Sequence, residues 1–312
     1  MRNFKEYLLL FFKGVGIGAA NVIPGVSGGT IAFITNIYEE LINSLKSFDL
    51  SAIKLASSFR FRELSGHVNL PFLLAIFLGV AVSIISLGRI LDFLFNEYPV
   101  QVWSFFFGLI LASIFFVGKK IKQWNFISIV MLMVGTALAV YISFLNPASE
   151  NENFIYLIFC GVVAISSMLL PGLSGSFVLI LMGNYRLLFL KAIPDFNIKI
   201  IIPVAIGAIV GFIGLSHLIA FVLKRFHDAT IAVLTGFILG SLLIIWPWKH
   251  AIYLQDQLGN LVIKDGEKVI QSYEHFLPQI TAASTLIAIA LMVSGIVSVW
   301  LIESFGESET EK

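Results

Sequence analysis

The sequence predicts an all-α polytopic membrane protein built from two inverted-topology repeats. Three observations indicate this fold: an apolar composition, six apolar segments long enough to cross a bilayer, and two apolar hairpins broken at similar motifs. Of the 312 residues, 58% are hydrophobic and 12% are charged, whereas soluble domains have about 45–50% apolar and about 25% charged residues. The mean hydropathy is +0.94. Most of the protein surface is therefore expected to face membrane lipids.

Six segments are expected to span the membrane, because a helix needs about 20 apolar residues to cross it. They are residues 70–95, 100–118, 124–145, 200–223, 229–246 and 280–302.

Two further apolar regions, residues 11–42 and 154–190, are each interrupted by a Pro-Gly-x-Ser-Gly motif. Each half of the first region is 13 residues long, or about 20 Å of helix, which is too short to cross comfortably. A shift of 147 residues places Pro24 on Pro171, Ser27 on Ser174 and Tyr38 on Tyr185. The pattern predicts two repeats, residues 1–150 and 151–312, each a re-entrant helical hairpin followed by three spans.

The two repeats are expected to enter the membrane from opposite sides, because a re-entrant hairpin makes no net crossing and three spans are an odd number. With the N-terminus inside, 13 of the 20 Lys and Arg residues face the cytoplasm and six face outward. The positive-inside rule favours this orientation, which also places the C-terminus in the cytoplasm. Inverted repeats of this kind are typical of secondary transporters.

The broken hairpins suggest an anion-binding site near the membrane midplane. Backbone that is not helical is costly in hydrocarbon unless it lines a cavity or is buried in protein. Helices that begin at Ser27 and Ser174 would direct backbone N–H groups inward, and glycines would let an anion approach the backbone. The candidate phosphate-binding residues are Gly25, Ser27, Gly28, Gly29, Thr30, Gly172, Ser174, Gly175 and Ser176. The alternative is that these serines are ordinary N-caps, the prolines kink helices and the glycines serve packing.

Several polar residues in apolar segments are candidate gates or charge partners, because such residues are rare in membranes and often functional. Arg89 lies three residues before Asp92, where an ion pair would make both tolerable. Glu39 and Arg186 occupy equivalent positions in the two hairpins with opposite charges. Asn21 precedes the first motif, and His217 lies in a predicted span, where hydrogen-bonded packing is the alternative to proton transfer.

The motifs resemble those of the bacterial polyprenyl-phosphate transporter family, long described as a domain of unknown function. The resemblance rests on residues 20–30, the Tyr38-Glu39 pair and residues 170–177, and it covers nearly the whole chain. It implies translocation of undecaprenyl phosphate across the bacterial plasma membrane for lipid-carrier recycling in cell-envelope synthesis. The chain departs from the family at Asn36, where the family has a glycine before the Tyr-Glu pair.

Two rival functions use similar physical chemistry. A membrane lipid-pyrophosphate phosphatase would need a cation on the phosphoryl group and nearby carboxylates, and neither hairpin motif contains Arg, Lys, Asp or Glu. A small-anion transporter or channel could use the same helix ends, and access to lipid from the side would distinguish it. We therefore expect no enzyme activity, no catalytic residues, no cofactor and no bound metal.

The expected partners are a polyprenyl-phosphate lipid and membrane lipids, and the sequence leaves a homo-oligomer open. Nucleic acid is excluded, because the net charge is +1 and no block of like charges forms a binding arm.

Overall fold

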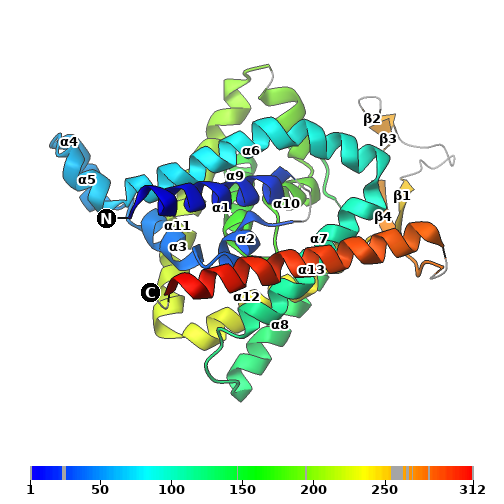
Figure 1. Ribbon diagram of the computed structural model, residues 1–312. Helices are drawn as coiled ribbons and strands as arrows, with labels where there is room; N and C mark the ends of the chain where they lie inside the picture. Colours follow the sequence, from blue (N-terminus) through cyan, green and yellow to red (C-terminus); the bar gives the residue numbers. More distant parts are fainter. Residues whose placement is uncertain are drawn as a thin grey trace.

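The fold is described from a computed structural model of the chain (Figure 1). The structure describes residues 2–22, 26–145, 147–193, 195–253, 263–264, 267–268, 270–279 and 282–310. Helices dominate, and the N- and C-terminal ends lie on the same side of the molecule, with the short strands at the opposite end (Figure 1).

The chain is a multi-pass membrane protein. Within the described ranges, four helices are long and apolar enough to cross a membrane, and the bent pair of α5 and α6 is a fifth candidate. The four are α7 (Pro99–Gly118), α8 (Phe126–Ser143), α11 (Ile198–Arg225) and α13 (Ala283–Thr310). Helix α5 (Phe61–His67) meets α6 (Leu70–Glu97) at an angle of 70°.

The predicted span at residues 229–246 is shorter in the structure. It corresponds to α12 (His227–Ser241), which has 15 residues and is followed by turns at residues 242–245. Those turn residues are Leu242, Leu243, Ile244 and Ile245, so their hydropathy does not distinguish them from the helix. The helix therefore falls short of the length that a perpendicular crossing needs.

The first broken region forms three helices: α1 (Phe4–Val22), α2 (Gly28–Ile34) and α3 (Tyr38–Lys46). Its first arm begins earlier than residue 11, and its second arm is divided at Asn36. Asn36 has a φ of 58°, in the left-handed region that glycine and asparagine tolerate best. Asn36, where the family resemblance leads us to expect glycine, thus has a backbone conformation that suits glycine.

The second broken region has a matching order of elements. Helix α9 (Phe154–Leu169) is followed by α10 (Gly175–Leu181) and by a π-helix, η1 (Leu187–Ala192). Gly183 separates α10 from η1 with a φ of 74°. Both second arms are therefore split shortly after the motif, at residues that adopt left-handed backbone.

The outer end of the molecule, as the predicted topology orients it, carries two small antiparallel pairs of strands. Strand β1 (Lys249–Tyr253) pairs with β4 (Ile270–His275), and β2 (Ile263–Lys264) pairs with β3 (Glu267–Lys268). Helices α4 (Leu50–Ser57) and α5 lie at the opposite end of the molecule from these strands (Figure 1).

Four close helix pairs form the body of the molecule: α1 with α6, α9 with α11, α7 with α13, and α8 with α12. Glycines lie at each contact. A Cβ added to Gly79 would clash with the carbonyl of Phe11, and one added to Gly207 would clash with that of Ile158. Small residues allow this approach, which gives helices in lipid their van der Waals contact.

The other two pairs, like the first two, use glycines from both partners. Cβ atoms added to Gly108 of α7 and Gly295 of α13 would each clash with backbone of the opposite helix, and Gly135 of α8 and Gly236 of α12 are equally confined. In both pairs, one helix comes from residues 1–150 and the other from residues 151–312. The two sequence halves therefore interlock.

At the centre lies α2, all seven of whose residues are buried. It packs against α1, α3, α7 and α9. The short helix after the first motif is thus held on every side by longer helices.

Replacement of Gly207 by alanine should destabilise the protein, because its Cβ would overlap the backbone of Ile158. Overpacking of this kind costs about 1–3 kcal/mol. Gly214 lies on the same helix with nothing within 4 Å of an added Cβ, so Gly214→Ala is the matched control and should be neutral or slightly stabilising. Thermal unfolding of the purified protein in detergent measures the difference. Equal unfolding temperatures for the two variants would contradict the close approach of α9 and α11.

Candidate functional site

The loops that follow the two Pro-Gly motifs are in direct contact. The Ser27 hydroxyl donates a hydrogen bond of 3.1 Å to the carbonyl of Leu170. The Gly172 amide donates one of 2.9 Å to Oγ1 of Thr30. Ser27 and Thr30 are 2% and 0% exposed, so these bonds lie inside the protein. Residues up to 143 positions apart are thus joined by hydrogen bonds, and the two loops lie against each other.

Tyr38 adds a third bond between the two hairpins. Its hydroxyl donates to the carbonyl of Leu169 at 3.0 Å, and its ring is buried against Phe33. Tyr38 matches Tyr185 by position in the repeat, but the sequence does not predict this contact. The only signal was the conserved spacing within the chain, since Tyr38 follows Ser27 at the same distance as Tyr185 follows Ser174.

In the first loop, the backbone amides at the start of α2 all have hydrogen-bond acceptors. The amide of Gly28 donates to Oδ1 of Asn21 at 3.0 Å, and that of Gly29 donates to Oγ of Ser27 at 3.2 Å. The amide of Thr30 donates to the Ser27 carbonyl. The structure therefore places Asn21, proposed from sequence as a gate or charge partner, as a cap on the first motif.

Fewer of the hydrogen-bond donors of the second loop have acceptors within the described structure. Oγ of Ser174 and Oγ of Ser176 lie 2.8 Å apart, and the amide of Phe177 makes a long bond of 3.5 Å to Ser174. Among the described residues, none accepts a hydrogen bond from the amides of Gly175 and Ser176. Two adjacent backbone donors and the one hydroxyl proton that the Ser174–Ser176 hydrogen bond leaves over are thus available together on this loop.

The difference between the loops has a cause in the sequence. The residue equivalent to Asn21 in the second repeat is Met168, and an added Cβ on Gly175 would meet its side chain at 2.5 Å. A Cβ on Gly28 would meet the Asn21 amide instead. A thioether is a poor acceptor, so the second loop keeps its backbone donors and the first does not.

Two glycines permit the loops to approach each other. Gly172 has a φ of 84°, which strongly favours glycine, and an added Cβ would lie 2.5 Å from the backbone of Phe237. At Gly29, an added Cβ would lie 3.2 Å from the carbonyls of Met168 and Leu169. Gly25, the remaining glycine of the predicted site, lies outside the described residues.

The predicted charge partners are spread over several places. Glu39 is an exposed residue whose carboxylate lies 3.6 Å from Nε2 of His227, at the start of α12. Arg186 precedes η1 as its N-terminal flanking residue. Arg89 is on α6, and its side chain lies outside the described part of the structure, so its pairing with Asp92 stays a prediction.

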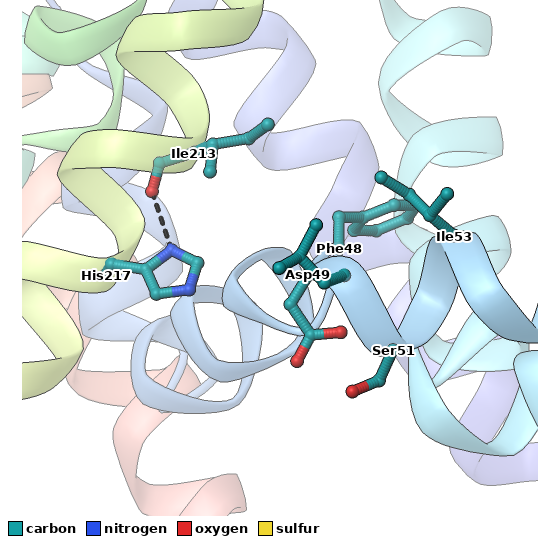
Figure 2. A pocket seen from close by; sticks show the side chains of 7 residues that line it. Phe48, Asp49, Ser51, Ile53, Ile213 and His217 are labelled. Carbon is teal, nitrogen blue, oxygen red and sulfur yellow. Dashed lines mark hydrogen bonds between the residues drawn. The ribbon is translucent and has the colours of Figure 1, made fainter.

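His217 lies on α11, where its Nδ1 is 2.8 Å from the carbonyl of Ile213 (Figure 2). It lines a cavity of about 450 Å³ together with residues that surround the start of α4. The lining residues are Phe48, Asp49, Leu50, Ser51, Ile53, Ile213 and His217. Because none of the loop residues lines it, this cavity is distinct from the site between the loops.

The described residues contain no group of three or more His, Cys, Asp and Glu side chains placed to hold a metal ion. The contact between the loops is made of hydroxyls, backbone amides and carbonyls. The hydroxyls and amides are donors from which an anion can accept hydrogen bonds, without a charged side chain within the two motifs.

Comparison with known proteins gives consistent results. The undecaprenyl phosphate translocase-like family matches residues 17–262. A polyprenyl-phosphate transporter from Vibrio cholerae is 34% identical over 97% of this chain and 98% of the relative. A polyprenyl-phosphate transporter from Staphylococcus aureus is 29% identical over 79% of this chain and 88% of the relative. No solved structure matches. The chain therefore belongs to the undecaprenyl phosphate translocase-like family.

Proposed function

We propose that the chain translocates a polyprenyl phosphate, such as undecaprenyl phosphate, across the bacterial plasma membrane. The observation that carries this proposal is the contact between two polar loops inside a multi-pass bundle of apolar helices. The names of the two relatives give the substrate class. The proposed activity is transport and not catalysis.

The physical difficulty in moving such a lipid is its head group. The isoprenoid tail can stay in hydrocarbon throughout, but a bare phosphate in the membrane core would lose its hydration at a cost of many kcal/mol. Buried hydrogen-bond donors can replace the lost water. The loops supply these donors at a depth that a lipid head group must pass.

In this proposal the phosphate binds first to the second loop. The amides of Gly175 and Ser176 and the hydroxyls of Ser174 and Ser176 are its donors. Ser27 and Thr30 approach from the other loop, and the glycines of both motifs provide space. A phosphate oxygen would then compete with the Leu170 carbonyl for the Ser27 hydroxyl, so binding and loop separation would be coupled.

The helix pairing supports the inverted repeats that the sequence predicts. If residues 1–150 and 151–312 are equivalent halves, α1 with α6 corresponds to α9 with α11, and α7 with α13 corresponds to α12 with α8. All four pairs are present. The termini also lie on one side of the molecule (Figure 1), which agrees with both being cytoplasmic.

Alternating access follows from the unequal use of equivalent residues. Tyr38 and Ser27 donate to carbonyls of the second loop, whereas Ser174 pairs with Ser176 and the Tyr185 ring packs on Phe189. Inverted-repeat transporters change sides when their repeats exchange conformations. In the opposite state, Tyr185 and Ser174 would therefore donate to the matching carbonyls of the first loop.

The topology can be tested with single cysteines that follow each hairpin. Lys46 and Lys199 are both exposed. In a Cys160→Ala background, Lys46→Cys should react with an impermeant maleimide from the cytoplasmic side and Lys199→Cys from the outer side. Labelling of both cysteines from one side would contradict the inversion of the repeats.

The anion site can be tested by removing its hydroxyls. The variant Ser174→Ala/Ser176→Ala should bind polyprenyl phosphate more weakly, because each hydrogen bond to a charged group contributes about 1.5–3 kcal/mol, or roughly 10- to 150-fold in affinity. Transfer of radiolabelled lipid between leaflets of proteoliposomes is the measurement, with thermal stability recorded alongside.

The matched control for this experiment is Ser167→Ala, because Ser167 is buried in α9 and its hydroxyl donates to the Val163 carbonyl of its own helix. It should transport normally. Flux of inorganic phosphate, measured in the same vesicles, separates the lipid carrier from a small-anion transporter. Normal lipid transfer by the double variant would mean that the loops serve packing alone.

The exchange of states can be tested with two tyrosine variants. Tyr38→Phe leaves the Leu169 carbonyl without its donor, which costs about 1–3 kcal/mol in the state described here. Tyr185→Phe should instead destabilise the opposite state. The two variants should therefore shift the labelling of a Ser176→Cys probe, measured from each side of the membrane, in opposite directions. A shift in the same direction for both would rule out reciprocal tyrosine contacts.

A further inference from the structure

Helices α4 and α5 form a hairpin, residues 50–67, that stands apart from the helical body at the end where the chain termini lie (Figure 1). Phe59 turns the chain between the two helices with a φ of 55°, and Asn69 joins α5 to α6 with a φ of 51°. Nε2 of His67 lies 3.1 Å from the Asp49 carboxylate. Both ends of the hairpin are thereby tied together.

The direction of α5 follows from that of α6. With 28 residues, α6 is about 42 Å long and can cross the bilayer without α5. If α6 alone crosses the membrane, close to its normal, α5 lies closer to the plane of the membrane than to its normal, because it meets α6 at 70°. In this orientation the chain leaves the hydrocarbon near Leu70, and the hairpin lies at the interface.

Four large apolar side chains of the hairpin are exposed, and two of them, Leu50 and Ile53, also line the open cavity beside His217. Leu50, Ile53, Phe59 and Phe61 are 83%, 65%, 79% and 61% exposed. The rings of Phe59 and Phe61 contact each other edge to face at 5.9 Å. So much apolar surface on a short exterior segment is unfavourable in water and requires an apolar partner.

The hairpin also carries cations. Arg60 is bound through two nitrogens to the carboxylate of Glu63, which neutralises its charge. No acidic side chain in the described ranges pairs with Lys54 or Arg62. Apolar residues beside unpaired cations on a segment parallel to the membrane are the features of an interfacial anchor on anionic lipids.

We propose that the α4–α5 hairpin docks on the anionic phospholipid surface of the leaflet nearest the N-terminus. Leu50, Ile53, Phe59 and Phe61 enter the boundary between head groups and acyl chains, and Lys54 and Arg62 bind lipid phosphates. This docking is separate from the site between the serine loops, and it requires neither the polyprenyl substrate nor its transport.

The test uses the full chain in vesicles with an environment-sensitive fluorophore on Phe61→Cys, in a Cys160→Ala background. In vesicles of phosphatidylcholine and phosphatidylglycerol at a ratio of about 3:1, the emission should shift to shorter wavelength and be quenched by lipids spin-labelled near the head group. A fluorophore on Gln123→Cys, an exposed position outside the hairpin, should show neither effect.

Charge variants show whether anionic lipid is the partner. Lys54→Gln/Arg62→Gln should lower the ratio of docked to undocked hairpin by roughly 25-fold, since each basic residue near an anionic surface contributes about fivefold. Lys122→Gln, which removes an exposed cation elsewhere, is the matched control and should have no effect. Unchanged thermal stability of each variant shows that the fold is retained.

Three results would overturn the proposal. The first is a water-like emission from the position 61 probe in anionic vesicles. The second is equal quenching in vesicles of pure phosphatidylcholine, which would remove the role of charge. The third is a shift of the probe emission that grows with protein density, together with crosslinking between position 61 cysteines. This result would identify a second copy of the chain as the partner.

Discussion

Backbone groups that lose their helical partners inside a membrane must find others within the protein, and this requirement fixes the centre of the structure. Helix α9 ends at Leu169, which leaves the carbonyls of Leu169 and Leu170 without helical donors. Tyr38 and Ser27 supply them, and Thr30 accepts from the Gly172 amide in return. The first broken segment thus supplies hydrogen-bond partners that the second lacks. These bonds help to hold α2, a helix of only seven residues, in a position where its whole length is buried.

The sequence was sufficient to predict a mostly helical multi-pass membrane protein and the breaks in two of its apolar regions, because hydropathy and the Pro-Gly motifs report directly on these features. The predicted span at residues 229–246 extended beyond the end of α12 at Ser241. Hydropathy could not show this end, because the residues after Ser241 are apolar whether or not they are helical. The hydrogen bond from Tyr38 to the Leu169 carbonyl could not be predicted either. It depends on the left-handed turn at Asn36, which sets the direction of α3, and local sequence patterns do not give that direction. Nor could spacing show that Asn21 would turn inward to cap the first motif.

The two loops are alike in sequence but unequal in chemistry. An asparagine satisfies the backbone donors at the start of α2, and a methionine leaves those at the start of α10 without an acceptor. At the proposed site, an anion would gain hydrogen bonds from the two amides of the second loop without first breaking any, whereas on the first loop it would replace existing ones. Unequal affinity of this kind would separate capture from release in a carrier, with the second loop holding the head group more firmly than the first.

The glycine contacts between α7 and α13 and between α8 and α12 join helices that are far apart in the chain. A ribosome makes α7 and α8 before it makes α12 and α13. The first half of the protein therefore enters the membrane with two closely fitting helix faces that have no partner yet. These contacts can close only after α12 and α13 have been inserted, since each contact joins a later helix to an earlier one. The order of packing is thus set by the fold and not by the order in which the residues are joined.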